Sequence, residues 1–340
     1  MKKITYKSAG VNVDAGNEFV KRIKVLASKT AQEGVVSPIG GFGGLFDISN
    51  LGCKHPVFVS SADGVGTKVK LALKMKKFDT VGIDAVAMNV NDILTLGARP
   101  LFFLDYLAIG RLKIEKCVKI VDGVAKGCKL AGCSLIGGET AEMPSVYKGE
   151  DFDLAGFCVG IVEKDKIIDG MDISNEDVII GLKSSGFHSN GFSLVRNILK
   201  TKKLSLSRKY EGLTKPLGQL LIEPTKIYVQ PVLSLIEKVN VKGMAHITGG
   251  SFKDKVSRII PDGLCATINR NSWMLPDIFK FIQQAGGIED EEMYKTFNCG
   301  IGYILIVSPQ DTREVLDFFG DEAIEIGFIE KNPEMKVNVV

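Results

Sequence analysis

A short apolar run that leads into a glycine-rich polar stretch constrains this chain more than any other feature. Residues 56–60 (PVFVS) have the composition of a buried strand, and Asp63-Gly64-Val65-Gly66-Thr67-Lys68 follow closely. A carboxylate suits Mg²⁺, glycines let backbone N–H groups approach, and hydroxyl and ammonium groups suit phosphate oxygens. The stretch is therefore a candidate wall of a nucleotide site, although an Asp-Gly pair after a strand also forms simple turns. It is not a Walker A loop, because no Gly-x-x-x-x-Gly-Lys-Ser/Thr occurs in the chain.

Length and charge narrow the class of protein. A chain of 340 residues exceeds the usual size of one hydrophobic core, so we expect two domains. The net charge of +3 is too small to predict a nucleic-acid partner or an anionic membrane. No apolar run approaches the roughly 18 residues of a membrane span, and the N-terminus lacks the apolar core of a signal peptide. Seven cysteines without a Cys-x-x-Cys pair indicate reduced thiols and a cytoplasmic location.

A predicted helix over residues 79–96 carries an unusual polar face. Asp84, Met88, Asn91 and Asp92 fall at i, i+4, i+7 and i+8, and therefore on one side of the helix. A solvated face would normally carry Lys and Glu, and this helix has neither. The pattern favours a cation or phosphate site over a solvated surface.

Two more glycine-rich segments stand beside these motifs. After a predicted strand at 134–136 comes Gly137-Gly138-Glu139-Thr140-Ala141-Glu142, which we interpret as a second loop of glycines and carboxylates leaving a strand end. Nearer the N-terminus, Gly40–Gly44 contains four glycines in five residues. This segment is either a linker turn or a lid that closes over a ligand, and the sequence favours neither.

The second half of the chain repeats the pattern of polar residues at strand ends. A charged boundary near 163–175 separates predicted domains 1–168 and 169–340. Ser184–Gly191 lies between a predicted strand and a helix N-terminus, where anions commonly bind. A predicted helix at 225–237 contains Pro231, which implies a kink or a break. Strands and helices mix without strict alternation, so the fold class is α+β, with two mixed α/β domains.

Five polar motifs follow one another in a fixed order: Asp63–Lys68, Asn89–Asp92, Gly137–Glu142, Ser184–Gly191 and His246–Gly250. Their order and spacing resemble the AIR synthetases, the family of phosphoribosylformylglycinamidine cyclo-ligases. Longer stretches agree as well, and they run nearly end to end: Tyr6–Val11, Asp14–Asn17, Pro100–Tyr106, Asp153–Lys164 and Met293–Gly300. No single motif has that specificity; the ordered set does.

The resemblance implies a fold, a reaction and partners. The family converts formylglycinamidine ribonucleotide to 5-aminoimidazole ribonucleotide with ATP and Mg²⁺, in purine biosynthesis. ATP activates the formyl amide oxygen, an amidine nitrogen closes the ring, and ADP and phosphate leave. The resemblance also implies a homodimer in which the N-terminal sheets form a shared barrel, and a layered α/β C-terminal domain.

The same resemblance, together with side-chain chemistry, gives candidate site residues. Metal ligands are expected at Asp63, Asp92 and Glu139. The expected ATP contacts are these three residues with Gly64, Gly66, Thr67, Lys68, Asn91, Gly137, Gly138 and Thr140. The expected substrate contacts are Ser185, His188, Asn190, His246 and Thr248. The expected catalytic residues are Lys68, His188 and His246, where either imidazole could move a proton or simply make a structural hydrogen bond.

Two departures from the family pattern affect the expected site. Ser61-Ala62 stand where Gly-Thr commonly precedes the aspartate, and Ser251 replaces a third glycine after Gly249-Gly250. Rival families differ more clearly. Selenophosphate synthetases carry a reactive cysteine near the N-terminal glycine-rich region, but the first cysteine here is Cys53. Hydrogenase-maturation proteins end in a cysteine-bearing tail, and thiamine-phosphate kinases should lack the motif at 184–191 in this form. A catalytically silent nucleotide-binding subunit is the remaining alternative.

Overall fold

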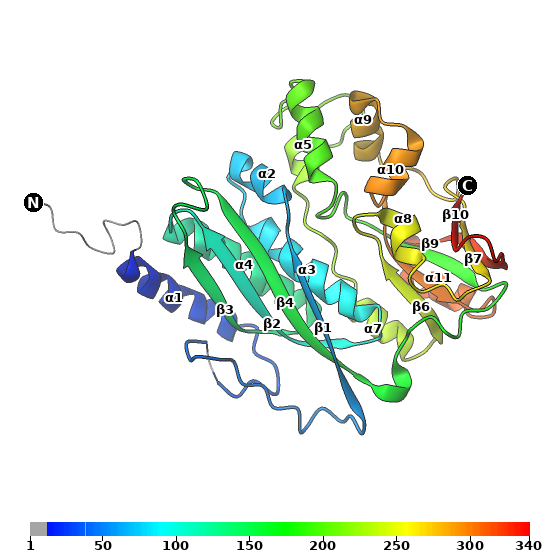
Figure 1. Cartoon of the computed structure of the whole chain (residues 1–340), viewed down its shortest axis with the longest axis horizontal. Coiled ribbons are helices and arrows are strands. Elements are labelled where there is room, and N and C mark those ends of the chain that lie inside the picture. The colour runs from blue at the N-terminus through cyan, green and yellow to red at the C-terminus, as the bar shows by residue number, and fades with distance from the viewer. Residues whose placement is uncertain (1–11, 38) are drawn as a thin grey trace, which may run out of the picture. The chain divides into compact units, whose positions relative to one another are not determined.

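The computed structural model describes residues 12–37 and 39–340, and the chain folds into two compact units (Figure 1). The first unit contains the chain up to Ile93 and then Arg99–Glu163. The second contains Leu94–Ala98 and Lys164–Val340. This division falls five residues before our predicted boundary at 168/169, and the predicted motif at Tyr6–Val11 lies outside the described residues.

A four-stranded sheet with helices on one face forms the first unit. Its elements are α1 (Val13–Ser28), β1 (Pro56–Gly64), α2 (Lys68–Met75), α3 (Asp79–Leu94), β2 (Arg99–Ile109), α4 (Ile114–Ala131), β3 (Ser134–Glu142) and β4 (Phe152–Glu163). The strand order is β1-β4-β2-β3, with β4 antiparallel to both β1 and β2, and β2 parallel to β3. Strands β1, β2 and β3 therefore run in one direction, and their carboxyl ends lie at the same edge of the sheet.

The two faces of this sheet differ in burial. On the face covered by α3 and α4, Phe103, Leu107 and Cys158 are completely buried. Side chains alternate between faces along a strand. On the opposite face Phe58, Tyr106 and Phe157 are 56%, 43% and 39% exposed. One face thus forms the core, while the other presents aromatic side chains to solvent.

The second unit is built on a six-stranded mixed sheet. Its elements are β5 (Val178–Lys183), α5 (Phe192–Thr201), α6 (Leu217–Leu221), α7 (Val229–Ile236), β6 (Val241–His246), α8 (Ser251–Val256), β7 (Leu264–Ile268), α9 (Asp277–Gly286), α10 (Asp290–Thr296), β8 (Ile301–Val307), α11 (Thr312–Phe319), β9 (Ala323–Lys331) and β10 (Val337–Val339). The strand order is β10-β7-β9-β5-β8-β6, and only β10 and β7 pair in parallel. Every residue of β8 is buried, as expected for a strand with neighbours on both sides. The α+β class and the mixed domains predicted from the sequence are confirmed.

Two local predictions were wrong. Gly137–Glu142 is not a loop, because β3 continues through Glu142 and pairs with β2 along that length. Pro231 does not break a helix, because α7 begins at Val229 and proline is tolerated in a first helical turn. None of the described helices is long and apolar enough to cross a membrane.

Candidate active site

The stretch Asp63–Lys68 joins the end of β1 to the start of α2. Asp63 and Gly64 are the last residues of β1, and the Asp63 carboxylate accepts a hydrogen bond from the Gly64 amide at 2.7 Å. Gly66 has a φ of +68°, which turns the chain between strand and helix. Asp63, Gly66 and Thr67 are exposed, so this turn lies at the surface of the unit.

Lys68 points the other way, into the core. Its side chain is 0% exposed, and its Nζ lies 2.9 Å from each carboxylate oxygen of Asp84 on α3, which is equally buried. A buried pair of this kind fixes geometry and is costly to break. The structure therefore gives Lys68 the role of anchoring α2 to α3. The phosphate contact predicted for Lys68 from the sequence stays a prediction.

The polar face of α3 is buried rather than solvated. Asn89 donates through its Nδ2 to the Asp63 carbonyl at 3.2 Å, which ties α3 to the end of β1. Asn91 is buried and Asp92 is partly exposed. Because residues three apart on a helix are neighbours, Asp92 lies one turn beyond the residue that holds Asp63. The structure thus brings Asp63 and Asp92 to the same region of the unit.

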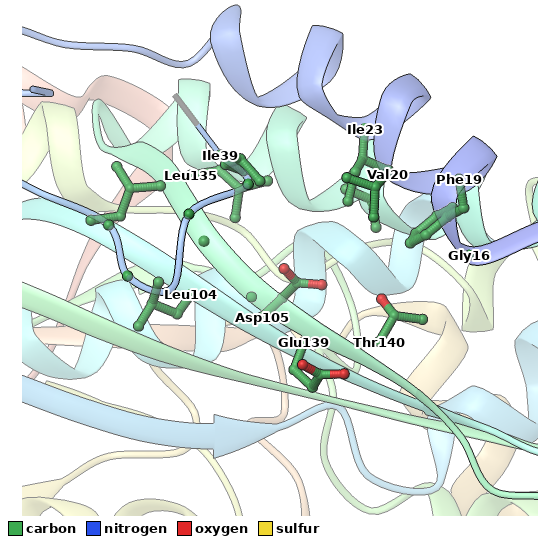
Figure 2. A pocket seen from close by; sticks show the side chains of 18 of the residues that line it. Gly16, Phe19, Val20, Ile23, Ile39, Leu104, Asp105, Leu135, Glu139 and Thr140 are labelled. Carbon is green, nitrogen blue, oxygen red and sulfur yellow. The ribbon is translucent and has the colours of Figure 1, made fainter. Parts of the chain in front are cut away.

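A cavity of about 550 Å³ lies between α1, the glycine-rich segment and the strands β2 and β3. Its volume is within the 300–1,000 Å³ typical of small-ligand pockets. Figure 2 shows Phe19, Val20 and Ile23 of α1 on one side of the cavity, with Asp105 and Thr140 pointing toward them. The cavity is also lined by Gly137, Gly138 and Glu139 of β3. The Glu139 side chain points away from α1. The apolar wall and the polar strand residues suit a nucleoside and its polar substituents.

The glycine-rich segment closes one side of this cavity. Residues 40–44 all line it, and a Cβ on Gly44 would lie only 2.8 Å from the Ile136 side chain. Glycine is therefore needed at this position for the loop to rest on β3. At the same time Phe42 is fully exposed, so the aromatic tip does not enter the cavity. Of the two interpretations left open by the sequence, a loop that covers a ligand agrees better with this position than a linker turn.

Asp105 is a site residue that we did not predict. It lies within β2, on the same face as Phe103 and Leu107, and it lines the cavity. A Cβ on the neighbouring Gly138 would lie 2.1 Å from its carboxylate, so glycine at that position makes room for it. Burial, together with the nearby charge of Glu139 and against a backbone hydrogen bond that lowers it, raises the pKa of Asp105 to about 7. The sequence signal was present: a single carboxylate interrupts the apolar run that begins at Leu101.

The three predicted metal ligands do not meet at one point. Within residues 12–37 and 39–340, no three His, Cys, Asp or Glu side chains gather as a metal site. Strands β1 and β3 are separated by β4 and β2, so at about 4.8 Å per strand Glu139 lies about 14 Å from Asp63. Mg²⁺ commonly takes one or two carboxylates and completes its shell with phosphates and water. Asp63 and Asp92 fit that pattern, while Glu139 stands apart from them.

The second unit holds the five predicted substrate contacts. Ser185 and His188 lie in the loop between β5 and α5, where the Ser185 amide donates to Nε2 of His188 at 3.3 Å. The Ser185 hydroxyl donates to the Pro224 carbonyl at 2.6 Å. His188 is 1% exposed and has a φ of +56°. Such a hydrogen bond at a turn is what a structural role would give, and the proton-transfer role of His188 stays a prediction.

The predicted residues of the following loop lie close to that turn. His246 ends β6 and is buried, with its ring centroid 6.2 Å from that of Tyr303. Thr248 is also buried. A Cβ on Gly249 would lie 3.4 Å from the side-chain oxygen of Asn190, so the two loops are in contact. The structure therefore brings the predicted substrate residues together, mostly in buried positions.

Comparisons with known proteins agree with this architecture. Residues 51–162 match the family model described as "AIR synthase related protein, N-terminal domain", and residues 174–340 match "AIR synthase related protein, C-terminal domain". Among solved structures, a thiamine-monophosphate kinase from Stenotrophomonas maltophilia K279a has a TM-score of 0.66 at 16% identity, covering 94% of this chain and 95% of that one. The hydrogenase maturation protein HypE in complex with ATP has a TM-score of 0.65 at 14% identity, covering 94% and 88%. At these identities the likeness concerns the fold alone.

Relatives in sequence are much closer. A phosphoribosylformylglycinamidine cyclo-ligase from Syntrophus aciditrophicus (strain SB) is 51% identical over 331 residues, which is 96% of this chain and 95% of the relative. Another from Burkholderia pseudomallei (strain 668) is 51% identical over 340 residues, 99% of this chain and 96% of the relative. Identity at this level extends over both units. The chain belongs to the phosphoribosylformylglycinamidine cyclo-ligase family.

Proposed function

We infer that this protein is a ligase that closes the ring of formylglycinamidine ribonucleotide to give 5-aminoimidazole ribonucleotide, with release of ADP and phosphate. The observation that carries this inference is the 51% identity to named cyclo-ligases over nearly the whole of both chains. The cavity of the first unit and the polar loops of the second supply two sets of groups that such a reaction needs. One set would bind ATP and the other the ribonucleotide.

The chemistry explains why positioning dominates. An amide oxygen is a poor leaving group, and transfer of a phosphoryl group to it makes it a good one. The protein then has to align the phosphoryl group with that oxygen and neutralise charge as it develops. Thr67 and Gly66 are exposed and Gly64 is half-buried, and their hydroxyl and backbone groups are suited to phosphate. Asn91, which is buried, and Asp92, which is half-buried, would add an amide and a carboxylate from α3. Lys68 contributes by fixing α2 through Asp84.

Mg²⁺ is part of the proposal. Asp63 and Asp92 would hold it, and when bound it would neutralise negative charge on the phosphates. The donor chemistry supports this assignment, since both are hard carboxylate oxygens next to the exposed turn after β1. Glu139, Thr140, Gly137 and Gly138 belong in this proposal to the part of the site that contacts ATP from β3.

The ribonucleotide would bind at the loops of the second unit. Ser185, His188, Asn190, His246 and Thr248 lie around one contact between loops, and the hydroxyls, amide and imidazoles can donate to phosphate or accept from an amidine. Either His188 or His246 would be the group that moves a proton during ring closure. Both are buried, which keeps water away from such a transfer.

The exposed aromatic face of the first sheet supports a homodimer. Phe58, Tyr106 and Phe157 come from three adjacent strands of this sheet and remain substantially exposed. Contiguous exposed apolar surface of this kind marks interaction sites in proteins. We propose that two copies bury these faces against each other and form a shared barrel. A cytoplasmic location is also part of the proposal, and the seven free thiols agree with it.

The test is the dependence of ADP release on the ribonucleotide. Purified protein with ATP and Mg²⁺ should release ADP only when formylglycinamidine ribonucleotide is present, and an equimolar amount of 5-aminoimidazole ribonucleotide should form. Thiamine monophosphate, which would be the substrate of a kinase with this fold, should give no release. ATP binding without turnover on the ribonucleotide would instead indicate a silent nucleotide-binding subunit, and would contradict the inference.

A further inference from the structure

The short segment between α10 and β8 contacts both polar loops of the second unit. Phe297 is buried, its ring centroid lies 4.9 Å from that of Phe187, and a Cβ on Gly191 would lie 2.2 Å from its ring. Phe297 therefore fills the space beside the loop of residues 184–191. Its position fixes the path of that loop as it enters α5.

Asn298 connects this segment to the same loop by hydrogen bonds. Its side chain is 3% exposed. Its Oδ1 accepts from the Ser184 hydroxyl at 3.1 Å and from the Gly300 amide at 2.9 Å, and its Nδ2 donates to the Gly186 carbonyl at 2.9 Å. One buried carboxamide thus makes three bonds, two of them to the loop that carries Ser185 and His188. Buried amides satisfied to this degree hold their surroundings in one arrangement.

Ser251 connects the segment to the other loop. It is 0% exposed, has a φ of +50°, and donates through its hydroxyl to the Phe297 carbonyl at 2.6 Å. A left-handed backbone explains why glycine is common at this position in the family. In this chain the strain of a non-glycine residue is offset by a buried hydrogen bond that glycine could not make. The departure seen in the sequence therefore adds a connection instead of removing one.

The two loops also contact each other where these bonds converge. Asn190 lies against Gly249, and the Ile247 amide donates to the Gly302 carbonyl of β8 at 3.0 Å. The Ser184 amide donates to the Gly300 carbonyl at 2.8 Å. Residues 297–302 thus accept from or donate to both loops along a continuous stretch of chain. We call Ser251, Phe297 and Asn298 the brace.

We propose that the brace holds the loops 184–191 and 246–251 in one arrangement, and that Asn298 is a positioning residue for the ribonucleotide. Asn298 would not touch the substrate; it would act through His188 and Ser185, whose loop it holds. The positioning role depends on the function inferred above, whereas the mechanical role of the brace does not. The two parts can therefore be tested separately.

Hydrogen exchange of the full-length protein without ligands tests the mechanical role. In Asn298→Ala, amides in both loops should exchange at least tenfold faster, whereas Asn269→Ala should leave them unchanged. Asn269 is a matched control, because its Oδ1 also accepts from a nearby amide, that of Asn271, but in an exposed turn. Ser251→Ala should accelerate exchange mainly in 246–251, and serves if Asn298→Ala does not fold. Unchanged exchange in both loops would overturn the brace.

Steady-state kinetics tests the positioning role. Asn298→Ala should raise the KM for formylglycinamidine ribonucleotide at least tenfold, while the KM for ATP stays within twofold, because the ATP residues belong to the first unit. Ser251→Gly, which relieves the strain but loses the hydroxyl, should show a smaller rise in the same KM. Faster exchange with an unchanged KM would refute positioning and leave the brace standing. If the wild-type protein does not close the ring at all, the proposed function is wrong. The hydrogen-exchange experiment would then still show whether the brace holds the two loops.

Discussion

The polar groups of the two units are prepared for ligands in opposite ways. In the first unit Asp63, Gly66, Thr67 and Glu139 are exposed at strand ends and turns. In the second unit the loop residues are largely buried and already hydrogen bonded, as with the Ser184 and Asn298 side chains. The exposed groups of the first unit lie where a ligand in solvent could reach them. The second is organised before any ligand binds.

This difference predicts how substitutions in each unit should affect stability and turnover. Exposed groups can be replaced at little cost in stability and a large cost in turnover. Replacing one member of a buried pair should mainly lower stability, because its partner is left buried without a hydrogen bond or counter-charge. The first unit contains a marked exception, the buried pair of Lys68 and Asp84 directly behind the exposed turn. The comparison predicts that a substitution in this pair lowers the stability of the protein, as we expect for the buried groups of the second unit.

Breaking that pair should give the largest effect. Lys68→Met leaves the Asp84 carboxylate buried without its cation and should lower the free energy of unfolding by about 3–5 kcal/mol. Denaturant unfolding followed by circular dichroism measures it. The control is Lys70→Met, which removes an exposed pair with Asp151 and should cost less than about 1 kcal/mol. Equal effects of the two substitutions would show that Lys68 is no structural anchor.

Asp105 should make the stability of the ligand-free protein depend on pH. Its pKa is about 7 in the folded protein and near the ordinary aspartate value of 3.8 when unfolded, so the folded state binds one more proton between these values. Stability is then lost as pH rises from about 4 to about 7, by up to about 4 kcal/mol at 1.36 kcal/mol per pH unit. Asp105→Asn should remove this loss and be more stable than wild type at pH 8, whereas the exposed Asp153→Asn should keep it. Parallel pH profiles for wild type and Asp105→Asn would contradict the buried position of this carboxylate.

The smallest expected effect concerns a partly exposed carboxylate on α3, Asp92. Asp92→Asn should lower turnover at least tenfold, about 1.4 kcal/mol of lost transition-state stabilisation, with little change in unfolding. The assay is ADP release at saturating ATP, Mg²⁺ and ribonucleotide. Asp79→Asn, at the other end of α3, removes only an exposed pair with Lys77 and should leave turnover within twofold. Unchanged kinetics for Asp92→Asn would remove this residue from the metal site.

Local sequence patterns predicted most helices and strands correctly. They failed where pairing with a distant strand determines the secondary structure. The helices α3 and α4 follow from their apolar periodicity and from the glycines that end them. The continuation of β3 through Gly137 and Gly138 could not be predicted, because glycines disfavour strands and only pairing with β2 holds them extended. In addition, no strand was predicted over residues 241–246, which form β6.

For the candidate site, the kinds of side chain present were easier to predict than the directions in which they point. The residue types at Asp63, Asn91 and Asp92 were enough to indicate a polar region, and the structure places them near one another. That Thr67 faces outward and Lys68 inward depends on the phase of α2 against α3, which no motif encodes. The compensation at Ser251 likewise needs a carbonyl from a segment 46 positions away in the chain.

The path of the chain between the units has a consequence for how this protein could have been assembled or divided. Leu94–Ala98, the end of α3 and the residues after it, group with the second unit, and the Ile168 amide donates to the Leu96 carbonyl there. The chain therefore changes unit after Ile93, after Ala98 and after Glu163. No single cut yields two intact pieces. A single genetic crossover after Glu163 would therefore exchange most of the second unit but leave Leu94–Ala98 with the sequence of the original protein.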